Sequence, residues 1–213
     1  MKKIFKQIAV VLTLGFSTGV FAGESALYDA EAPPTSAFIR VFNSSTGSEL
    51  SDVQLGEKTI SKVKPVSASS YIYLLEGNHK FVVGDKSLSL DLKKGHFYTL
   101  TNLGSELKVI EDKPFDSKKK SMVSFYNFLN ENGATLATAD GKLKVVEDVK
   151  YQKNGFREIN PVRVSLTAMV DGNKVGSPQS VSLERGRVFS FFACGTKASP
   201  VLVKVENNID TSI

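Results

Sequence analysis

The second half of this chain repeats the order of strand-like segments found in the first half. The segment "AFIRVFN" at residues 37–43 corresponds to "SMVSFYN" at residues 121–127, and both end in Asn where a turn begins. The closest match pairs "LKKGHFYTL" at residues 92–100 with "LERGRVFSF" at residues 183–191. Such self-similarity indicates that one supersecondary unit is used twice, which restricts the fold to two copies of the same architecture.

Both copies consist of short runs rich in Val, Ile, Phe, Tyr and Thr that alternate with period two, separated by Gly, Asn, Asp and Pro. This pattern predicts strands rather than helices. We therefore predict an all-β protein made of two tandem β-sandwich domains that arise from an internal duplication. The expected domains are residues 37–110 and 121–213, joined by a charged linker at residues 111–120. We expect that strands of the two copies do not interleave in one sheet.

The first 22 residues have the features of a secretory signal peptide. Lysines at the start precede an apolar stretch, and small residues lead up to Gly23, which we predict to be the first residue after cleavage. A membrane anchor is the alternative, but the apolar run is shorter than the ~20 residues that cross a bilayer. Loss of the leader reduces the 27 basic residues to 24, against 22 acidic ones, a net charge of +2. This balance argues against a nucleic-acid-binding protein.

Residues 23–36 form a predicted N-terminal arm, with the apolar pair Leu27 and Tyr28 ahead of Pro33 and Pro34. The prolines favour an extended backbone. Such an arm can pack on its own domain, as terminal segments commonly do. Alternatively, it can dock a partner by adding an edge strand or filling a groove. Leu27 and Tyr28 are therefore candidate partner-binding residues.

Few residues of the chain are suited to catalysis or to metal binding. The two histidines, His79 and His96, both lie in the first copy, and His96 aligns with Arg187 in the second. Cys194 is the single cysteine, so an intramolecular disulfide is excluded, and we predict a buried, inert thiol. No spacing of these residues resembles a zinc ligand set. We expect no catalytic residue, no metal and no cofactor.

The segment "REINP" at residues 157–161 predicts a polar turn that leads into a strand. One interpretation is structural, with Asn160 bonding the turn and Arg157 pairing with a neighbouring acid. The other is that Arg157, Glu158 and Asn160 contact a partner protein, since Arg is enriched at interfaces.

Several of these segments together resemble the AlgF family, periplasmic proteins of bacterial alginate O-acetylation, and similar proteins of cellulose acetylation clusters. The similar segments are "ALY", "SAFIRVFN", "FYTL", "KPF", "TADGK", "REINPVRVSL" and "LERGRV", in order along the chain. The resemblance implies a two-domain β-sandwich adaptor in the periplasm that is required for O-acetylation of an exopolysaccharide. The polymer that it implies first is alginate. It also implies that the protein is not an enzyme. Its partners would be a membrane-bound O-acyltransferase and periplasmic SGNH-like acetyltransferases.

Two other functions are open on the sequence alone. A polysaccharide-binding module is the main alternative, because β-sandwiches host many kinds of site. Tyr71 and Tyr73 lie on one strand face as a candidate sugar platform, although tyrosines at such positions more often pack in a core. An acetyl carrier or transferase would need an activated Ser, Cys or His.

Overall fold

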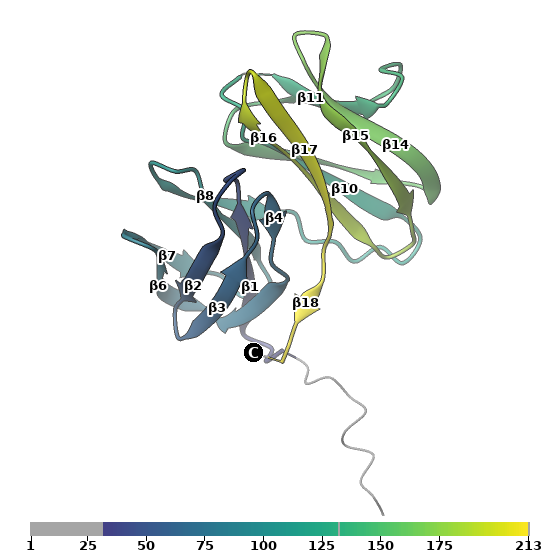
Figure 1. Ribbon diagram of the computed structural model, residues 1–213. Helices are drawn as coiled ribbons and strands as arrows, with labels where there is room; N and C mark the ends of the chain where they lie inside the picture. Colours follow the sequence, from purple (N-terminus) through teal and green to yellow (C-terminus); the bar gives the residue numbers. More distant parts are fainter. Residues whose placement is uncertain (1–31, 132, 213) are drawn as a thin grey trace, which may run out of the picture.

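The computed structural model describes residues 32–131 and 133–212, and every regular element in them is a β-strand. The all-β prediction is thus confirmed. The strands form four sheets, two built from the first half of the chain and two from the second (Figure 1). In the described ranges, no helix is long and apolar enough to cross a membrane. The predicted signal peptide lies outside the described residues.

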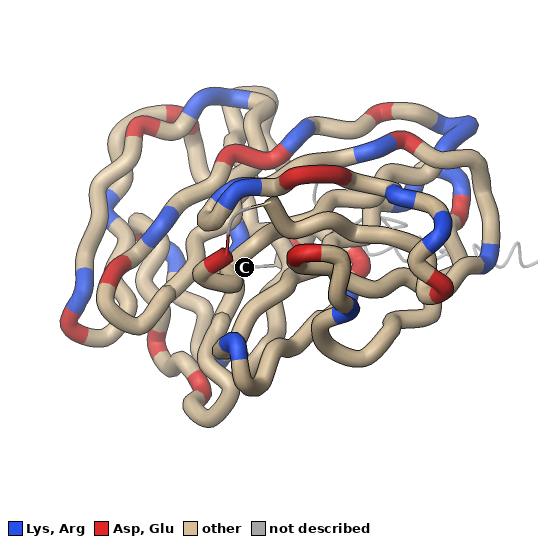
Figure 2. The backbone as a smooth tube through the Cα atoms, turned by 90° about the horizontal axis from the view of Figure 1, so that it is seen from above, with Lys and Arg blue, Asp and Glu red and all other residues tan. Residues whose placement is uncertain are grey.

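Basic and acidic positions are interspersed along both halves of the molecule (Figure 2). This distribution agrees with the small net charge expected of the mature chain, and it favours recognition by local contacts over long-range attraction.

The first half contains two sheets that share one core. The larger sheet has the order β5-β1-β8-β9, with β4 paired to β1, and the smaller has the order β3-β2-β6-β7. The strands of the larger sheet are β1 (Ser36–Asn43), β4 (Ser67–Ala68), β5 (Tyr71–Leu75), β8 (Phe97–Asn102) and β9 (Leu107–Asp112). Those of the smaller sheet are β2 (Leu50–Leu55), β3 (Lys58–Val63), β6 (Gly77–Val83) and β7 (Lys86–Leu92). Their inward-facing residues form one buried cluster that includes Ile39, Val41, Leu55, Phe81 and Leu100.

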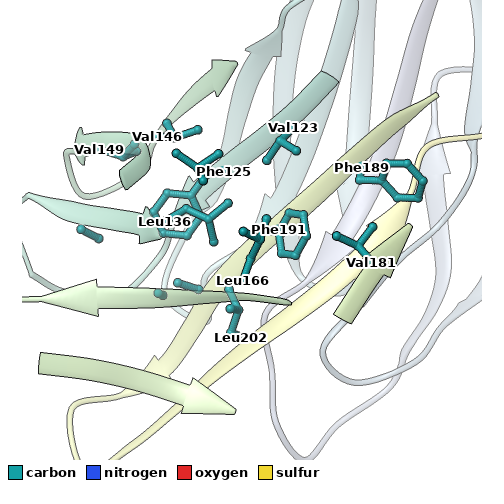
Figure 3. Close-up of a cluster of buried hydrophobic side chains, with 14 of the residues drawn as sticks. Val123, Phe125, Leu136, Val146, Val149, Leu166, Val181, Phe189, Phe191 and Leu202 are labelled. Carbon is teal, nitrogen blue, oxygen red and sulfur yellow. The ribbon is translucent and has the colours of Figure 1, made fainter. Parts of the chain in front are cut away.

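The second half repeats this arrangement. One sheet has the order β13-β10-β16-β17 and the other β12-β11-β14-β15. The first contains β10 (Ser121–Asn127), β13 (Lys153–Ile159), β16 (Val188–Thr196) and β17 (Ser199–Glu206). The second contains β11 (Ala134–Thr138), β12 (Lys144–Val149), β14 (Val162–Val170) and β15 (Asn173–Leu183). Between them lies a core that includes Phe125, Leu136, Leu166 and Phe191 (Figure 3).

The repeated Asn at the end of the first strand has the same role in both halves. Asn43 Nδ2 donates to the carbonyl of Val63 at 3.1 Å, and Asn127 Nδ2 donates to the carbonyl of Val149 at 2.9 Å. Both side chains also accept a backbone N–H two residues later. In each half the first strand pairs in parallel with the strand that follows the Lys/Arg-Gly turn. Matching sequence positions therefore have matching places in the two halves.

The C-terminal strand departs from the expected separation of the halves. β18 (Ile209–Asp210) pairs in parallel with β5, so a segment that follows the second half completes the edge of a first-half sheet. Tyr71 N also donates to the carbonyl of Asn208 at 2.8 Å. β18 lies at the edge, so strands of the two halves do not interleave, but the first-half sheet is completed by a segment from beyond the second half. The physical reason is that β5 would otherwise present unpaired backbone groups.

The outward faces of two sheets, one from each half, pack against each other. Their contact forms a third buried cluster built around Phe42 of β1 and Tyr126, Phe192 and Cys194 of β10 and β16. The rings of Phe42 and Phe192 are stacked with centroids 4.0 Å apart. The two halves thus share a buried apolar contact in addition to the connecting segment.

Candidate functional site

The residues predicted to form a polar turn lie mostly in a strand. Arg157 and Glu158 are part of β13, and only Asn160 and Pro161 lie in the turn that leads to β14. The turn prediction is therefore wrong for the two charged residues. Successive residues of a strand point to opposite faces, so Arg157 and Glu158 face different surroundings. They do not form one contact patch.

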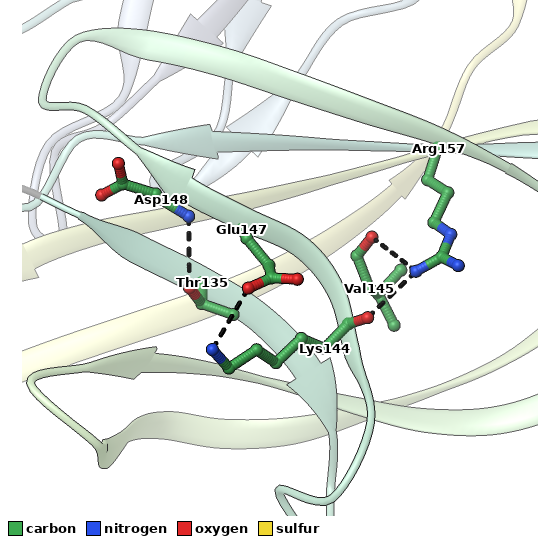
Figure 4. Close-up of polar contacts among 6 residues, drawn as sticks. All are labelled: Thr135, Lys144, Val145, Glu147, Asp148 and Arg157. Carbon is green, nitrogen blue, oxygen red and sulfur yellow. Dashed lines mark hydrogen bonds and ion pairs between the residues drawn. The ribbon is translucent and has the colours of Figure 1, made fainter.

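Arg157 connects the two sheets of the second half along one side. Its Nη1 donates to the carbonyl oxygens of Lys144 and Val145, at 3.0 Å and 3.5 Å (Figure 4). Both carbonyls belong to β12, the edge strand of the opposite sheet. These partners are backbone carbonyls rather than the neighbouring acid of the structural interpretation. Arg157 therefore has a structural contact that accounts for its position.

Glu158 lies on the other face of β13, in a surface that also contains a half-exposed aromatic ring. Its Oε2 is 3.7 Å from Lys120 Nζ, in an ion pair whose side chains are about half exposed. Phe156, two residues earlier, is 50% exposed, and Lys113 Nζ lies 5.7 Å from its ring centroid. We call Phe156, Glu158, Lys113 and Lys120 the β13 face. The sequence reasoning selected Glu158 and missed Phe156, which directly precedes the charged pair.

A surface hollow of 300 Å³ adjoins the β13 face. Its lining includes Phe156 and Asn154 of β13, together with Lys113 and Pro114 of the connecting segment. An aromatic residue beside a hollow, with charges around it, is a common composition for a protein-binding surface.

The remaining predicted contact residues are less informative. Asn160 is exposed, and its side chain makes no hydrogen bond to any residue that the structure describes. Leu27 and Tyr28 lie outside the described residues.

Each of the two histidines has its own partner. His96 Nδ1 is 2.7 Å from Glu111 Oε1 at an exposed position, and His79 Nε2 is 2.8 Å from the carbonyl oxygen of Leu75. Within residues 32–131 and 133–212, no group of three or more His, Cys, Asp or Glu side chains could hold a metal ion.

Cys194 is fully buried in the contact between the halves. This burial raises the pKa of its thiol from 9.0 to about 12. Because the thiolate is the reactive form, the thiol is held in its unreactive state at neutral pH.

A buried arginine joins the two halves. Arg40 of β1 is fully buried and donates four hydrogen bonds through its guanidinium. Its Nε donates to Thr99 Oγ1 at 2.9 Å, within its own half. Its Nη atoms donate to the second half, to Asn207 Oδ1 and Ser190 Oγ at 2.8 Å and to Tyr126 OH at 3.0 Å. The charge is thus bonded across the domain contact.

Asp112 is the acidic counterpart in this network. Its carboxylate accepts the hydroxyls of Thr99 at 2.6 Å, Tyr126 at 2.7 Å and Tyr71 at 2.8 Å. Thr99 and Tyr126 therefore each accept from Arg40 and donate to Asp112, which links the two charges through hydroxyl groups. We call Arg40, Tyr71, Thr99, Asp112 and Tyr126 the interdomain network.

The network perturbs the pKa values of its members. Burial alone would lower the pKa of Arg40, but Tyr126, Tyr71 and Asp112 outweigh it and raise that pKa. Burial and the adjacent Asp112 raise the pKa of Tyr71 well above its ordinary value, and that of Tyr126 as well. Arg40 therefore stays charged and both phenols stay protonated. The network is suited to holding the halves together rather than to proton transfer near neutral pH.

The proposed sugar platform does not form. Tyr71 is 2% exposed and belongs to the interdomain network, so it cannot stack on a ligand from solvent. Tyr73 is half-buried, and Lys58 Nζ lies 3.3 Å from its ring centroid. The alternative interpretation of these tyrosines, packing, is correct for Tyr71.

Comparison with known families and proteins gives a consistent result. A family model described as "Alginate O-acetyl transferase AlgF" matches residues 9–190. The alginate biosynthesis protein AlgF of Pseudomonas syringae pv. tomato is 40% identical over 208 residues, which cover 95% of this chain and 92% of that protein. The AlgF of Pseudomonas aeruginosa is 38% identical over 202 residues, with 93% and 92% covered.

Two solved structures of Pseudomonas aeruginosa AlgF domains are also similar. Its C-terminal domain is 39% identical and covers 42% of this chain and all of that domain, with a TM-score of 0.39. Its N-terminal domain is 29% identical and covers 39% of this chain and all of that domain, with a TM-score of 0.34.

Proposed function

This chain belongs to the AlgF family, and from that membership we propose that it is a non-catalytic periplasmic adaptor for O-acetylation of alginate. In this proposal it links a membrane-bound O-acyltransferase to periplasmic SGNH-like acetyltransferases. The family membership itself establishes a role in alginate biosynthesis and O-acetylation. The adaptor mechanism, its partners and the absence of catalysis are the proposed part.

The observation that carries the proposal is the β13 face. Phe156 is half exposed on an edge strand although its neighbours in the sheet are well packed, and Lys113, Lys120 and Glu158 surround it. An exposed aromatic ring within a rim of charges is the usual composition of a binding hot spot. We assign this face to a protein partner, with Glu158 in direct contact and Arg157 in a supporting position behind it.

The non-catalytic part of the proposal is supported by the contacts of the two side chains best suited to react, Cys194 and His96. The thiol of Cys194 is buried, with a pKa of about 12. His96 bonds Glu111, and the matching position in the second half is Arg187, whose N–H and carbonyl make the same backbone contacts. A Ser, Cys or Thr nucleophile is commonly activated by a base within hydrogen-bond reach, and among the described residues the histidine rings hydrogen-bond only Leu75 and Glu111.

We further infer that each half is a β-sandwich and that the two arose by internal duplication. The equal strand orders, the two parallel pairs and the matched Asn43 and Asn127 contacts support this origin. Periplasmic location by way of a cleaved signal at residues 1–22 belongs to the same proposal.

Binding to purified partners tests the adaptor role. The mature protein is titrated against immobilised SGNH-like acetyltransferases and, separately, against alginate. We expect Phe156→Ala to weaken acetyltransferase binding by on the order of tenfold or more, as for a hot-spot residue. The matched control is Leu143→Ala, because Leu143 is also apolar, lies in the same half and is 59% exposed. Thermal melts of both variants show whether either change acts through folding.

Unchanged binding by Phe156→Ala at an unchanged melting temperature would exclude the β13 face as the contact. Binding to alginate without binding to any acetyltransferase would favour the polysaccharide-binding alternative.

Complementation of a deletion strain tests the non-catalytic assignment. We expect His96→Ala to restore normal alginate acetylation in a strain that lacks the protein, because His96 only pairs with Glu111 at the surface. A correctly folded His96→Ala protein that abolishes acetylation would overturn the non-catalytic assignment.

A further inference from the structure

An apolar strip runs across the outward face of the β5-β1-β8 sheet, beyond the area that the second half covers. Phe97, Phe38 and Tyr73 are direct neighbours on β8, β1 and β5, and all three are half-buried. The rings of Phe38 and Phe97 are stacked with centroids 4.6 Å apart. Leu75, two residues after Tyr73 on the same face, is 49% exposed. Partly exposed rings in one row form a surface that another apolar group can cover.

The strip leads into a cavity between the two halves. The cavity measures 140 Å³, and its lining includes Tyr71 and Phe97 of the first half, Val188 of the second, Phe115 of the connecting segment and Ile209 of β18. An engineered cavity of about 150 Å³ accepts a benzene molecule, so this one has the size of a single aromatic or leucine side chain.

A tight turn directly precedes the strip. Ser36 N donates to the carbonyl of Pro33 at 3.0 Å, which closes a four-residue turn directly before β1. Pro34 is the second residue of that turn, where proline is favoured. Glu76 N donates to the carbonyl of Thr35, so the turn lies beside the end of β5, next to Leu75. The direction of the backbone therefore changes between Pro33 and Ser36.

One buried hydroxyl at the start of the strip lacks a partner. Ser36 is 3% exposed and its Oγ has no hydrogen-bond partner among the residues that the structure describes. It lies on the same face as Phe38, since the two are alternate residues of a strand. Buried hydroxyls are almost always satisfied, so a further polar group is expected beside it.

The chemistry of residues 23–31, which lie outside the described residues, matches this surface. Their sequence is "GESALYDAE", in which an apolar triplet is flanked by three acids and no base. The strip is bordered by Lys58, whose Nζ lies over the Tyr73 ring, and by Lys113 at the cavity. The eight backbone steps from Tyr28 to Ser36 span up to ~26 Å when extended, whereas positions of the strip two residues apart along a strand are separated by ~7 Å. The triplet can thus reach both the strip and the cavity.

We propose that the N-terminal arm of the mature chain docks on its own first domain, with Leu27 and Tyr28 covering the strip of Phe97, Phe38 and Tyr73 and one of them filling the cavity. The arm then bridges both halves at the open side of their contact. Leu27 and Tyr28 then pack on their own domain, which is one of the two roles that the sequence left open for the arm. This assignment does not depend on the adaptor function.

A single tryptophan reports on this contact, because the chain contains none. Tyr28→Trp is introduced into the purified mature protein, and its emission and acrylamide quenching are measured without any partner. We expect emission to be shifted to the blue, and quenching to be weaker, relative to a Leu143→Trp control at an exposed position. Adding Leu75→Asp and Ile209→Asp to Tyr28→Trp places carboxylates against the acidic arm at two half-exposed positions, and both signals should then approach the control.

Emission that equals the control and does not respond to the two aspartates would overturn the proposal. A blue shift that depends on protein concentration would assign the arm to a second copy of the chain. A blue shift that appears only with an acetylation protein present would assign the arm to that partner. Either result would also overturn the proposal.

Discussion

Arg157 and Glu158 are adjacent in sequence, yet their contacts predict different effects of substitution. We expect Arg157→Ala to lower the free energy of unfolding by about 1 kcal/mol, the usual net value of a lost hydrogen bond, because two β12 carbonyls lose their donor. Glu158→Ala should change it by ~0–1 kcal/mol, since its ion pair with Lys120 is half exposed. Urea denaturation of both variants measures the difference. A larger loss for Glu158→Ala than for Arg157→Ala would contradict the assignment of Arg157 as the structural member.

The buried thiol of Cys194 predicts a loss of stability at alkaline pH. Its pKa is raised from 9.0 to about 12 in the folded protein. The folded state therefore keeps a proton that the unfolded state releases, so this contribution is complete below pH 9 and is lost as pH rises toward 12. We expect the free energy of unfolding to fall between pH 9 and pH 10, before most of the tyrosine titration, and Cys194→Ala to show a smaller slope. Equal slopes for the two proteins would show that the thiol does not contribute.

The contributions of single residues were only partly predictable from the sequence. Burial of Cys194 followed from its apolar segment, and the Asn at the end of the repeated strand was correctly placed at a turn. The sequence does contain an indication of the role of Arg40, because it is a charged residue inside the apolar run "AFIRVFN", at the position where the second copy has Ser124. Its meaning depends on Ser190 and Asn207, which are 150 and 167 residues away along the chain. No local pattern connects such partners.

Among the elements, strands rich in Val, Phe, Tyr and Thr were predictable, whereas β13 and β18 were not. β1, β8, β10 and β16 lie in such segments at matching positions of the two copies. The sequence of β13, "KNGFREI", has no regular apolar alternation. The Asn-Pro pair that follows it is typical of a turn, so a turn was predicted there instead of a strand. β18 has two residues and exists because β5 offers an unpaired edge. Strand propensity of this kind is set by the neighbours rather than by the segment itself.

The edge position of β18 leads to a prediction for the C-terminal segment. Deletion of residues 208–213 removes both the pairing with β5 and the bond from Tyr71 N to the carbonyl of Asn208. We expect a lower melting temperature and faster proteolysis, because the edge of β5 is then uncovered and the cavity beside Ile209 is open. Deletion of residues 211–213 alone is the control and should change neither. If both truncations melt like the intact protein, β18 does not stabilise the sheet.

The arrangement of the two halves depends on contacts that neither half shows alone. A repeat in sequence indicates two similar units, but the faces by which they meet are read only from the buried cluster around Phe42 and Phe192 and from the interdomain network. Both features use outward-facing positions of strands that a single sandwich would leave in water. This explains why the sequence predicted two independent domains, whereas the structure has a buried contact between them. The β13 face therefore keeps a constant orientation relative to the first domain.

That constant orientation is the basis of a prediction about cooperativity. The Arg40 guanidinium donates to three side chains of the second half, and Asp112 accepts from Tyr126, so both charges depend on the contact between the halves. Removing one member of a buried charge pair typically costs 3–5 kcal/mol, whereas replacing both with apolar residues is often nearly neutral. We therefore expect Arg40→Leu to separate unfolding into two calorimetric transitions, one for each half, where the unmodified protein shows one.

The double variant Arg40→Leu with Asp112→Leu should recover much of the lost stability, because no unpaired charge is then left in the contact. Arg163→Leu is the control, since Arg163 is an exposed arginine in β14 and its loss should leave a single transition. Differential scanning calorimetry distinguishes the variants, and small-angle scattering shows whether the halves move apart. A single transition at an unchanged midpoint for Arg40→Leu would mean that the apolar cluster of Phe42, Phe192 and Cys194 holds the halves without the charges. The buried arginine would then contribute to the choice of one orientation but not to its stability.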